Sequence, residues 1–214
     1  KKAIVTGASS GIGMSIAAAL VGAGHEVYGI GRSFCEDCEI LKNPLLHPRV
    51  CDLKRHADVE REIKHIREES GGIDILVNCA GVGYFGPHEQ ISPDRLHEMV
   101  AVNVEAPMII AGMLLRDMKK CGGTIINISS VTAKKSNTYG CAYGATKAAL
   151  TSFGESLFDE ARKYGVKVVN IHPDMTESHF YRNADFRACD EDDMRLLPEE
   201  IAGCVTDVLN MREG

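Results

Sequence analysis

The sequence predicts an α/β fold in which a doubly wound parallel sheet lies between two layers of helices. Short apolar runs of strand length alternate along the chain with longer amphipathic runs of helical length. Strands that alternate with helices are joined by right-handed crossovers, and these give a parallel sheet covered on both faces. A chain of 214 residues suits one domain with a sizeable core, and no linker or internal repeat divides it. We therefore expect a single three-layer domain over residues 1–214.

The expected elements are bounded by residues that typically begin or end them. Three glycines between positions 7 and 13 separate the first strand from the first helix. Ser92 and Pro93 mark a later helix start, because serine favours the cap and proline the first turn. The expected strands cover residues 3–5, 26–30, 49–51, 73–79, 124–129 and 166–171, and the expected helices cover 12–23, 58–69, 93–119, 142–164 and 198–211. The last strand of such a sheet is missing from this chain, and residues 174–197 are expected to form a mobile substrate lid.

Composition excludes several classes of partner. The formal net charge of -6 offers no basic stripe, so we expect no nucleic acid partner. The longest apolar run, residues 108–115, is too short to cross a bilayer, so we expect no membrane partner. Eight cysteines in a chain with no recognisable secretory signal fit free thiols in a reducing cytoplasm. The sequence therefore predicts a cytoplasmic protein.

The glycines after the first strand lie in the stretch TGASSGIG, residues 6–13. At a strand-to-helix turn they let the backbone approach a ligand and expose the first amides of the helix, which attract a pyrophosphate. The strand before and the helix after supply the context that this motif requires, although a plain glycine-rich turn is the alternative. We predict a Rossmann-like dinucleotide site with contacts from Gly7, Ser9, Ser10, Gly11, Ile12 and Gly13.

The end of the second expected strand indicates which dinucleotide is bound. An acidic residue that holds the adenosine ribose is expected about 20 residues after the glycine loop, and Gly31 stands at that place. A carboxylate would repel a 2′-phosphate, whereas the guanidinium of the next residue, Arg32, can bind it through paired hydrogen bonds. The sequence therefore predicts NADP(H). The alternative is that Arg32 is a solvated loop residue.

The stretch YGCAYGATK, residues 139–147, combines a phenol and an ammonium on an otherwise small-residue helix. Residues four apart share a helix face, so Tyr143 and Lys147 point the same way. An ammonium near a phenol favours the phenolate and lowers its pKa from about 10, which makes Tyr143 a usable proton donor or acceptor. Tyr139 has no lysine four residues later, and we interpret it as a pocket-wall or surface residue.

Several motifs occur in order and at separations that together define a family. They are Thr6-Gly7-x-x-x-Gly11-x-Gly13, Asp52-Leu53, Asn78-Cys79-Ala80-Gly81, Asn103, Ser129-Ser130 and Tyr143-x-x-x-Lys147. With them the chain resembles the compact short-chain dehydrogenases/reductases over about residues 3–173. The resemblance implies a catalytic tetrad in which the serine lies thirteen residues before the tyrosine. The tetrad residues are Asn103, Ser130, Tyr143 and Lys147.

The resemblance also implies a role for each tetrad residue. Tyr143 protonates the substrate oxygen during carbonyl reduction, and Ser130 donates a hydrogen bond to that oxygen as charge develops. Lys147 tunes Tyr143 and binds the hydroxyls of the nicotinamide ribose. Asn103 interrupts its helix and holds a water that relays protons to Lys147.

Further cofactor contacts follow from the same resemblance. Asp52 is similar to the residue that meets the adenine, and Asn78 to the one that braces the central strands beside the cofactor. The remaining implied contacts are Leu53, Ala80, Gly81, Pro173 and, by counting, Ser178. The chain departs from the family pattern where Cys79 replaces a second asparagine and where Asp174 replaces the glycine after the proline.

The predicted function is hydride transfer between NADP(H) and a carbonyl or alcohol substrate, with reduction as the expected direction. The alternative is a non-catalytic NADP(H)-binding regulator, whose signature would be a broken tetrad beside an intact glycine loop. The helix that carries Tyr143 has a second apolar face, and the resemblance implies that this helix pairs with its copy across a two-fold axis, so we expect a homodimer or homotetramer. That face includes Leu150, Phe153, Leu157 and Phe158, and the residues expected to line the substrate pocket are Val82, Tyr84, Val131, Tyr139 and Phe180.

The cysteines near the second expected strand suggest a zinc site as a hypothesis. Cys35, Cys38, His47 and Cys51 could supply four zinc ligands. Their spacing matches no zinc module that we recognise, and Cys51 precedes Asp52 at a strand end that faces the adenine. We predict free thiols and no metal.

Overall fold

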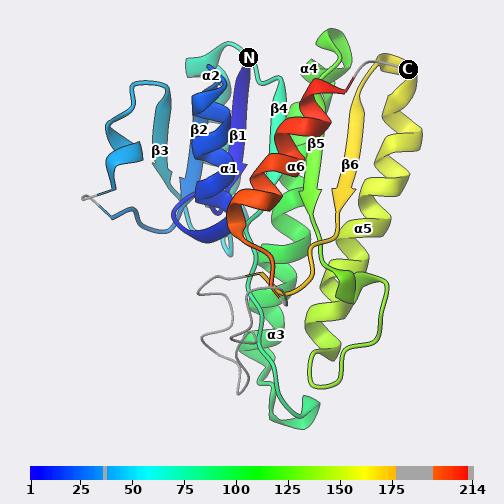
Figure 1. Cartoon of the computed structure of the whole chain (residues 1–214). Coiled ribbons are helices and arrows are strands. Elements are labelled where there is room, and N and C mark those ends of the chain that lie inside the picture. The colour runs from blue at the N-terminus through cyan, green and yellow to red at the C-terminus, as the bar shows by residue number, and fades with distance from the viewer. Residues whose placement is uncertain (36–37, 177–194, 212–214) are drawn as a thin grey trace.

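A computed structural model describes residues 1–35, 38–176 and 195–211, and its centre is one six-stranded parallel sheet (Figure 1). The strands follow the order β3-β2-β1-β4-β5-β6, which is the order of doubly wound dinucleotide-binding folds. The predicted fold class is therefore confirmed, and within the described ranges the sheet ends at β6. The strands are β1 (Lys2–Thr6), β2 (Glu26–Gly31), β3 (Leu46–Val50), β4 (Ile75–Asn78), β5 (Thr124–Ile128) and β6 (Lys167–Ile171).

Helices cover both faces of this sheet. On one face α1 and α6 lie side by side, and their apolar side chains share a core cluster that includes Ile16, Leu20 and Ile201 (Figure 1). On the other face α2, α4 and α5 share a second cluster that includes Ile63 and Ile110. The helices are α1 (Gly11–Gly22), α2 (His56–Ser70), α3 (Pro93–Val100), α4 (Ala106–Cys121), α5 (Cys141–Ala161) and α6 (Pro198–Asn210). Short 3-10 turns are η1 (Glu39–Lys42), η2 (His88–Gln90), η4 (Val131–Ala133) and η5 (Arg162–Tyr164).

The third strand differs from the prediction. We expected only residues 49–51, but β3 begins at Leu46 and ends at Val50. His47 and Pro48 interrupt the apolar pattern, and proline in particular argues against a central strand. At the sheet edge a proline is tolerated because its missing N–H faces away from the ladder, and β3 is the edge strand that pairs Pro48 with Gly29.

The predicted interruption at Asn103 is present in the structure. A π-helical turn, η3 (Ala101–Glu105), separates α3 from α4, and such turns often lie at functional sites. The whole segment Pro93–Cys121 is long and apolar enough to pass a length and composition test for a membrane span. Core helices pass the same test, and here Leu114 and Met118 pack in the core cluster against the sheet.

The topology fixes where a ligand can bind. All six strands run in parallel, so their carboxyl ends meet at one edge of the sheet. The order reverses between β1 and β4, and a crevice forms at such a switch point. Thr6, Gly31, Asn78 and Ile128 end four of the strands at this edge.

Candidate active site

A cleft of about 270 Å³ opens at the carboxyl edge of the sheet and brings together most of the predicted site residues. The predicted residues that line it are Gly7, Ser9, Ser10, Gly11, Ile12, Gly13, Arg32, Asp52, Leu53, Ala80, Gly81, Ser130, Tyr143, Lys147 and Pro173. Asn78 and Asn103 do not line it, and Ser178 and Phe180 lie outside the described residues. Residues of the predicted glycine loop and of the predicted tetrad thus line one continuous cleft.

The glycine loop has the geometry of a phosphate cradle. Gly7 has a φ of +73°, and a Cβ on it would lie 2.9 Å from the Cα of Ala80. A Cβ on Gly13 would lie 2.2 Å from the carbonyl oxygen of Gly7, so helix α1 packs directly on the loop. The amides of the first turn of α1 have no partner within the helix, and this turn carries no acidic side chain. These features fit a dinucleotide pyrophosphate.

Thr6 ties the glycine loop to the neighbouring strand end. Its Oγ1 accepts hydrogen bonds from the main-chain N–H groups of Cys79 and Ala80, each at 3.0 Å. Because Thr6 ends β1 and Cys79 follows β4, these bonds clamp the two strands at the switch point. The clamp holds residues 79–81 in the cleft wall.

The end of the cleft beside β2 and β3 holds two cations and two carboxylates. Arg32 and Asp52 were predicted there, whereas sequence analysis missed Lys54 and Glu98. Lys54 Nζ lies 3.8 Å from a carboxylate oxygen of each acid. Glu98 also accepts a hydrogen bond of 2.7 Å from Tyr84, which raises the pKa of that phenol. Lys54 directly follows the Asp52-Leu53 motif, and this position in the sequence could have identified it as a cleft residue.

Gly31 is required by the packing of the loop as well as by charge. A Cβ on Gly31 would lie 2.8 Å from the Cβ of Ser9 and 3.0 Å from its Oγ. Any side chain at position 31 would therefore push against the glycine loop. The absence of an acidic residue at this strand end thus has a steric reason in addition to the electrostatic one.

Tyr143 and Lys147 lie on one face of α5 and point into the cleft, as predicted. Both are buried, and Lys147 Nζ lies 5.8 Å from the centroid of the Tyr143 ring. The same Nζ donates a hydrogen bond of 2.8 Å to the carbonyl oxygen of Ile128 at the end of β5. Burial lowers the pKa of Lys147 to about 8, and the nearby Cys79 opposes this shift. Burial likewise raises the pKa of the Cys79 thiol to about 12.

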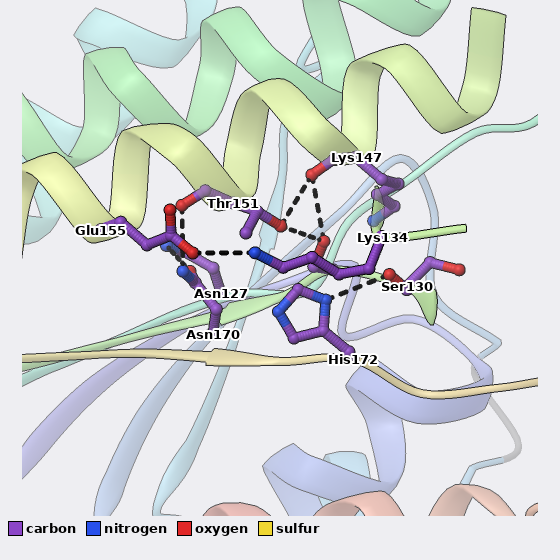
Figure 2. A network of polar contacts seen from close by, with 9 residues as sticks. Asn127, Ser130, Lys134, Lys147, Thr151, Glu155, Asn170 and His172 are labelled. Atoms are coloured by element: carbon purple, nitrogen blue, oxygen red, sulfur yellow. Dashed lines mark hydrogen bonds and ion pairs between the residues drawn. The ribbon is translucent and has the colours of Figure 1, made fainter. Parts of the chain in front are cut away.

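The two serines after β5 have different partners. Ser129 Oγ donates to the main-chain carbonyl of Lys147 at 3.1 Å and lies 2.8 Å from Thr151 Oγ1, so its hydroxyl is engaged with α5. Ser130 lines the same cleft as Tyr143, and the His172 ring reaches the main-chain carbonyl of Ser130 at 3.1 Å (Figure 2). This division fits the expected assignment of Ser130 over Ser129 as the catalytic serine.

Asn103 lies behind the cleft wall. Its side chain is fully buried, with 0% of its surface exposed. The Oδ1 atom accepts from the N–H of Val82, and the Nδ2 atom donates to the Val82 carbonyl and to Thr146 Oγ1, at 2.8, 2.9 and 3.0 Å. The side chain therefore fastens the loop after β4 to α5, and the hypothesis of a water relay has to rely on the main chain of Asn103.

Asn78 braces the sheet beside the cleft. Its Nδ2 donates to Asn127 Oδ1 at 2.9 Å, and Asn127 in turn donates to Asn170 at 3.0 Å. These bonds connect β4, β5 and β6 below α5, where Figure 2 shows Asn127 and Asn170 together. A Cβ on Gly154 of α5 would lie 2.2 Å from Asn170 Oδ1, so the helix needs a glycine to pass over this row of amides.

Other predicted residues lie away from the cleft. Tyr139 is 59% exposed and has a φ of 63°, which is unusual for a residue with a side chain. Tyr84 and Val131 also do not line the cleft, whereas Val82 does. Cys35 is exposed and Cys38 is half-buried, and the described residues contain no cluster of metal-ligating side chains.

The fold and this cleft define a dinucleotide-binding protein with a tyrosine and a lysine at its reacting end. A family model described as short chain dehydrogenase matches residues 1–186. An uncharacterised oxidoreductase of Staphylococcus saprophyticus is 31% identical over 209 residues, which cover 94% of this chain and 88% of that protein. The chain therefore belongs to the short-chain dehydrogenase family and is a nicotinamide-dependent oxidoreductase.

Two solved structures show the same fold with a nicotinamide nucleotide. An alcohol dehydrogenase from Thermococcus sibiricus, complexed with 5-hydroxy-NADP, is 27% identical with a TM-score of 0.88 and covers 99% of this chain and 91% of its own. A 3-ketoacyl-(acyl-carrier-protein) reductase from Brucella melitensis, complexed with NADH, is 25% identical with a TM-score of 0.89 and covers 97% and 90%. These neighbours support a nicotinamide cofactor. One of them binds a derivative of NADP and the other binds NADH, so both cofactor types occur on this fold.

Proposed function

We propose that this protein is an NADP(H)-dependent reductase of a carbonyl substrate. The observation that carries the proposal is Arg32, which follows Gly31 at the end of β2 and lines the same cleft as Tyr143. The steric demand of Ser9 keeps position 31 free of a carboxylate, so a 2′-phosphate would meet a cation there. The names of the two structural neighbours, an alcohol dehydrogenase and a ketoacyl reductase, support an alcohol/carbonyl pair as the reacting group.

The residues of the cleft would divide the work of carbonyl reduction. A reduced nicotinamide held in this cleft would supply the hydride that the carbonyl carbon accepts. The Tyr143 hydroxyl donates its proton to the carbonyl oxygen as negative charge develops there, and the Ser130 hydroxyl donates a hydrogen bond to the same oxygen. Lys147 places a buried cation beside the Tyr143 ring, which favours the phenolate left after proton transfer.

A screen of NADPH consumption tests this proposal. The purified chain would be offered small ketones, diketones, ketoacyl thioesters, keto sugars and keto steroids with either NADPH or NADH. We expect turnover on at least one class, with NADPH preferred. Tight NADPH binding without turnover on any class would instead support the non-catalytic regulator.

Loss of Arg32 is expected to weaken the use of NADPH selectively. A charge-assisted hydrogen bond contributes roughly 1.5–3 kcal/mol, so Arg32→Ala should shift the ratio of kcat/KM for NADPH over NADH by about 10- to 150-fold. The change should appear as a higher KM for NADPH, with NADH nearly unaffected. Steady-state kinetics with both cofactors at low and high salt measure it, and the shift should shrink as salt screens the exposed guanidinium.

Arg55→Ala is the matched control for this experiment. Arg55 is exposed, pairs with Asp58 and does not line the cleft, so its loss should leave the cofactor ratio unchanged. A wild-type preference for NADH, or a ratio that Arg32→Ala does not move, would contradict the cofactor assignment. Gly31→Asp is a poor companion variant, because the new side chain would collide with Ser9.

We also propose that the protein assembles into a homodimer or homotetramer through the outer surfaces of α4 and α5. Leu150 and Leu157 of α5 pack inside the core, but Phe158 is 41% exposed and Met108 of α4 is 36% exposed. Light scattering of the purified chain is expected to give the mass of a dimer or tetramer, and Phe158→Glu should shift it towards monomer. A wild-type chain that is monomeric at all accessible concentrations would contradict the proposal.

A further inference from the structure

Thr132 lies two residues after the catalytic serine and contacts its hydroxyl twice. In the turn η4, the main-chain N–H of Thr132 donates to Ser130 Oγ at 3.2 Å, and Thr132 Oγ1 donates to the same atom at 3.0 Å. A serine hydroxyl has two acceptor lone pairs and one hydrogen to donate. Thr132 therefore fills both acceptor positions of Ser130 Oγ. The Ser130 hydroxyl can then only donate its own hydrogen.

The surroundings hold this turn in place. The N–H of Val131 donates to the Pro173 carbonyl at 3.0 Å, and the His172 ring bonds the Ser130 carbonyl. A Cβ on Gly144 would lie 3.3 Å from the Thr132 carbonyl oxygen, so the turn packs on α5 one residue after Tyr143. The turn is thus anchored both to the segment that follows β6 and to α5, the helix that carries Tyr143.

The direction of the serine hydrogen matters for the reaction. The substrate oxygen becomes negative during reduction and needs hydrogen-bond donors aimed at it. A serine hydroxyl with a vacant lone pair could instead accept a hydrogen bond from the Tyr143 hydroxyl. That bond would point the tyrosine proton away from the substrate and would turn the Ser130 hydrogen elsewhere.

We propose that Thr132 is a positioning residue, which fills the acceptor side of Ser130 and thereby commits the serine hydroxyl to donating towards the substrate oxygen. This inference rests on the proposed carbonyl reductase function. It assigns a role to the second hydroxyl of a Ser-x-Thr sequence at the end of β5, residues 130–132. Thr132 itself does not line the cleft, so it acts through Ser130.

Single variants test the contribution of the threonine hydroxyl. Thr132→Val removes Oγ1 but keeps the branched shape and the main-chain bond to Ser130, and we expect kcat to fall about 3- to 12-fold, the scale of one hydrogen bond. Thr132→Ser keeps the hydroxyl and should stay within about twofold of the wild type. Thr138→Val, at an exposed position on the same connection, is the matched control and should have no effect. The dissociation constant for NADPH should be unchanged in all three.

The decisive comparison uses Ser130→Ala as a background. If Thr132 acts through Ser130, adding Thr132→Val to Ser130→Ala should change kcat by less than about twofold. A drop in the double variant as large as that caused by Thr132→Val alone would mean that the threonine only supports the fold, and the proposal would be overturned.

A second measurement does not depend on turnover. In a high-resolution crystal structure of Thr132→Val, we expect Ser130 to rotate and its Oγ to come within hydrogen-bond distance of the Tyr143 hydroxyl. A Ser130 rotamer identical to that of the wild type would overturn the proposal even if no substrate is ever found. A wild-type protein that reduces no carbonyl would refute the proposed function alone, because the crystallographic result would still decide the role of Thr132.

Discussion

The Tyr143→Phe variant is expected to turn over substrate at least about 100-fold more slowly than the wild type, with NADPH binding unchanged. The substitution removes the hydroxyl that donates the proton and keeps the ring, and lost general acid catalysis is typically of this size. The ring is buried, and its centroid lies 5.3 Å from that of Phe85, so a phenylalanine should occupy the same place. Single-turnover measurements with saturating cofactor would show that the loss lies in the reaction and not in binding.

Tyr139→Phe is the matched control for this prediction. Tyr139 lies four residues before Tyr143, is largely exposed and does not line the cleft, so its hydroxyl should be dispensable. We expect activity within about twofold of the wild type, because surface substitutions of this kind change little. An inactive Tyr139→Phe beside an active Tyr143→Phe would reverse the assignment of the proton donor.

Much of the fold could be predicted because its signals are local. Every crossover except the one from β2 to β3 contains an α-helix that is adjacent in sequence to its strands, so the alternation of apolar patterns predicted the parallel direction of the sheet. The exception was β3, where Pro48 is compatible with a strand only because β3 lies at the sheet edge. Whether a strand lies at the sheet edge depends on the order of all the strands, and no single segment of the sequence determines that order.

The predictable part of the site is local for the same reason. The glycine loop lies within residues 6–13, and Tyr143 and Lys147 are one helical turn apart, so spacing alone could place them. Lys54 and Glu98 meet because the loop after β3 and helix α3 converge on one cleft from separate parts of the chain. The position of Asn103 was predicted, but its hydrogen bonds to Val82 and Thr146 depend on three elements that meet only after folding.

Replacement of Lys147 by methionine is expected to separate activity from stability. Methionine has a similar length and no charge, so Lys147→Met removes the buried cation beside Tyr143 and its hydrogen bond to Ile128. We expect turnover to fall by about 100-fold or more, since the variant loses the charge that favours the phenolate. Lys64→Met, at an exposed surface position, is the control and should leave turnover unchanged.

The same variant should unfold less readily than the wild type at neutral pH when no cofactor is bound. Burial lowers the pKa of Lys147 from 10.5 to about 8, so the folded state disfavours the ammonium that the unfolded state carries without penalty. Below pH 8 the lysine is protonated in both states and this penalty is fully present. Between pH 8 and 10.5 the folded protein has released the proton while the unfolded chain retains it, so the stability of the wild type rises with pH across this window.

Methionine has no proton to lose, so the advantage of Lys147→Met should be largest below pH 8. It should shrink by an amount on the order of 3 kcal/mol as the pH rises to 10.5, because one pKa unit corresponds to about 1.4 kcal/mol. Urea unfolding of both proteins at several pH values between 7 and 10.5 measures this difference. A free-energy difference that stays constant with pH would show that burial does not disfavour the Lys147 ammonium, and the lysine would then be an ordinary structural cation.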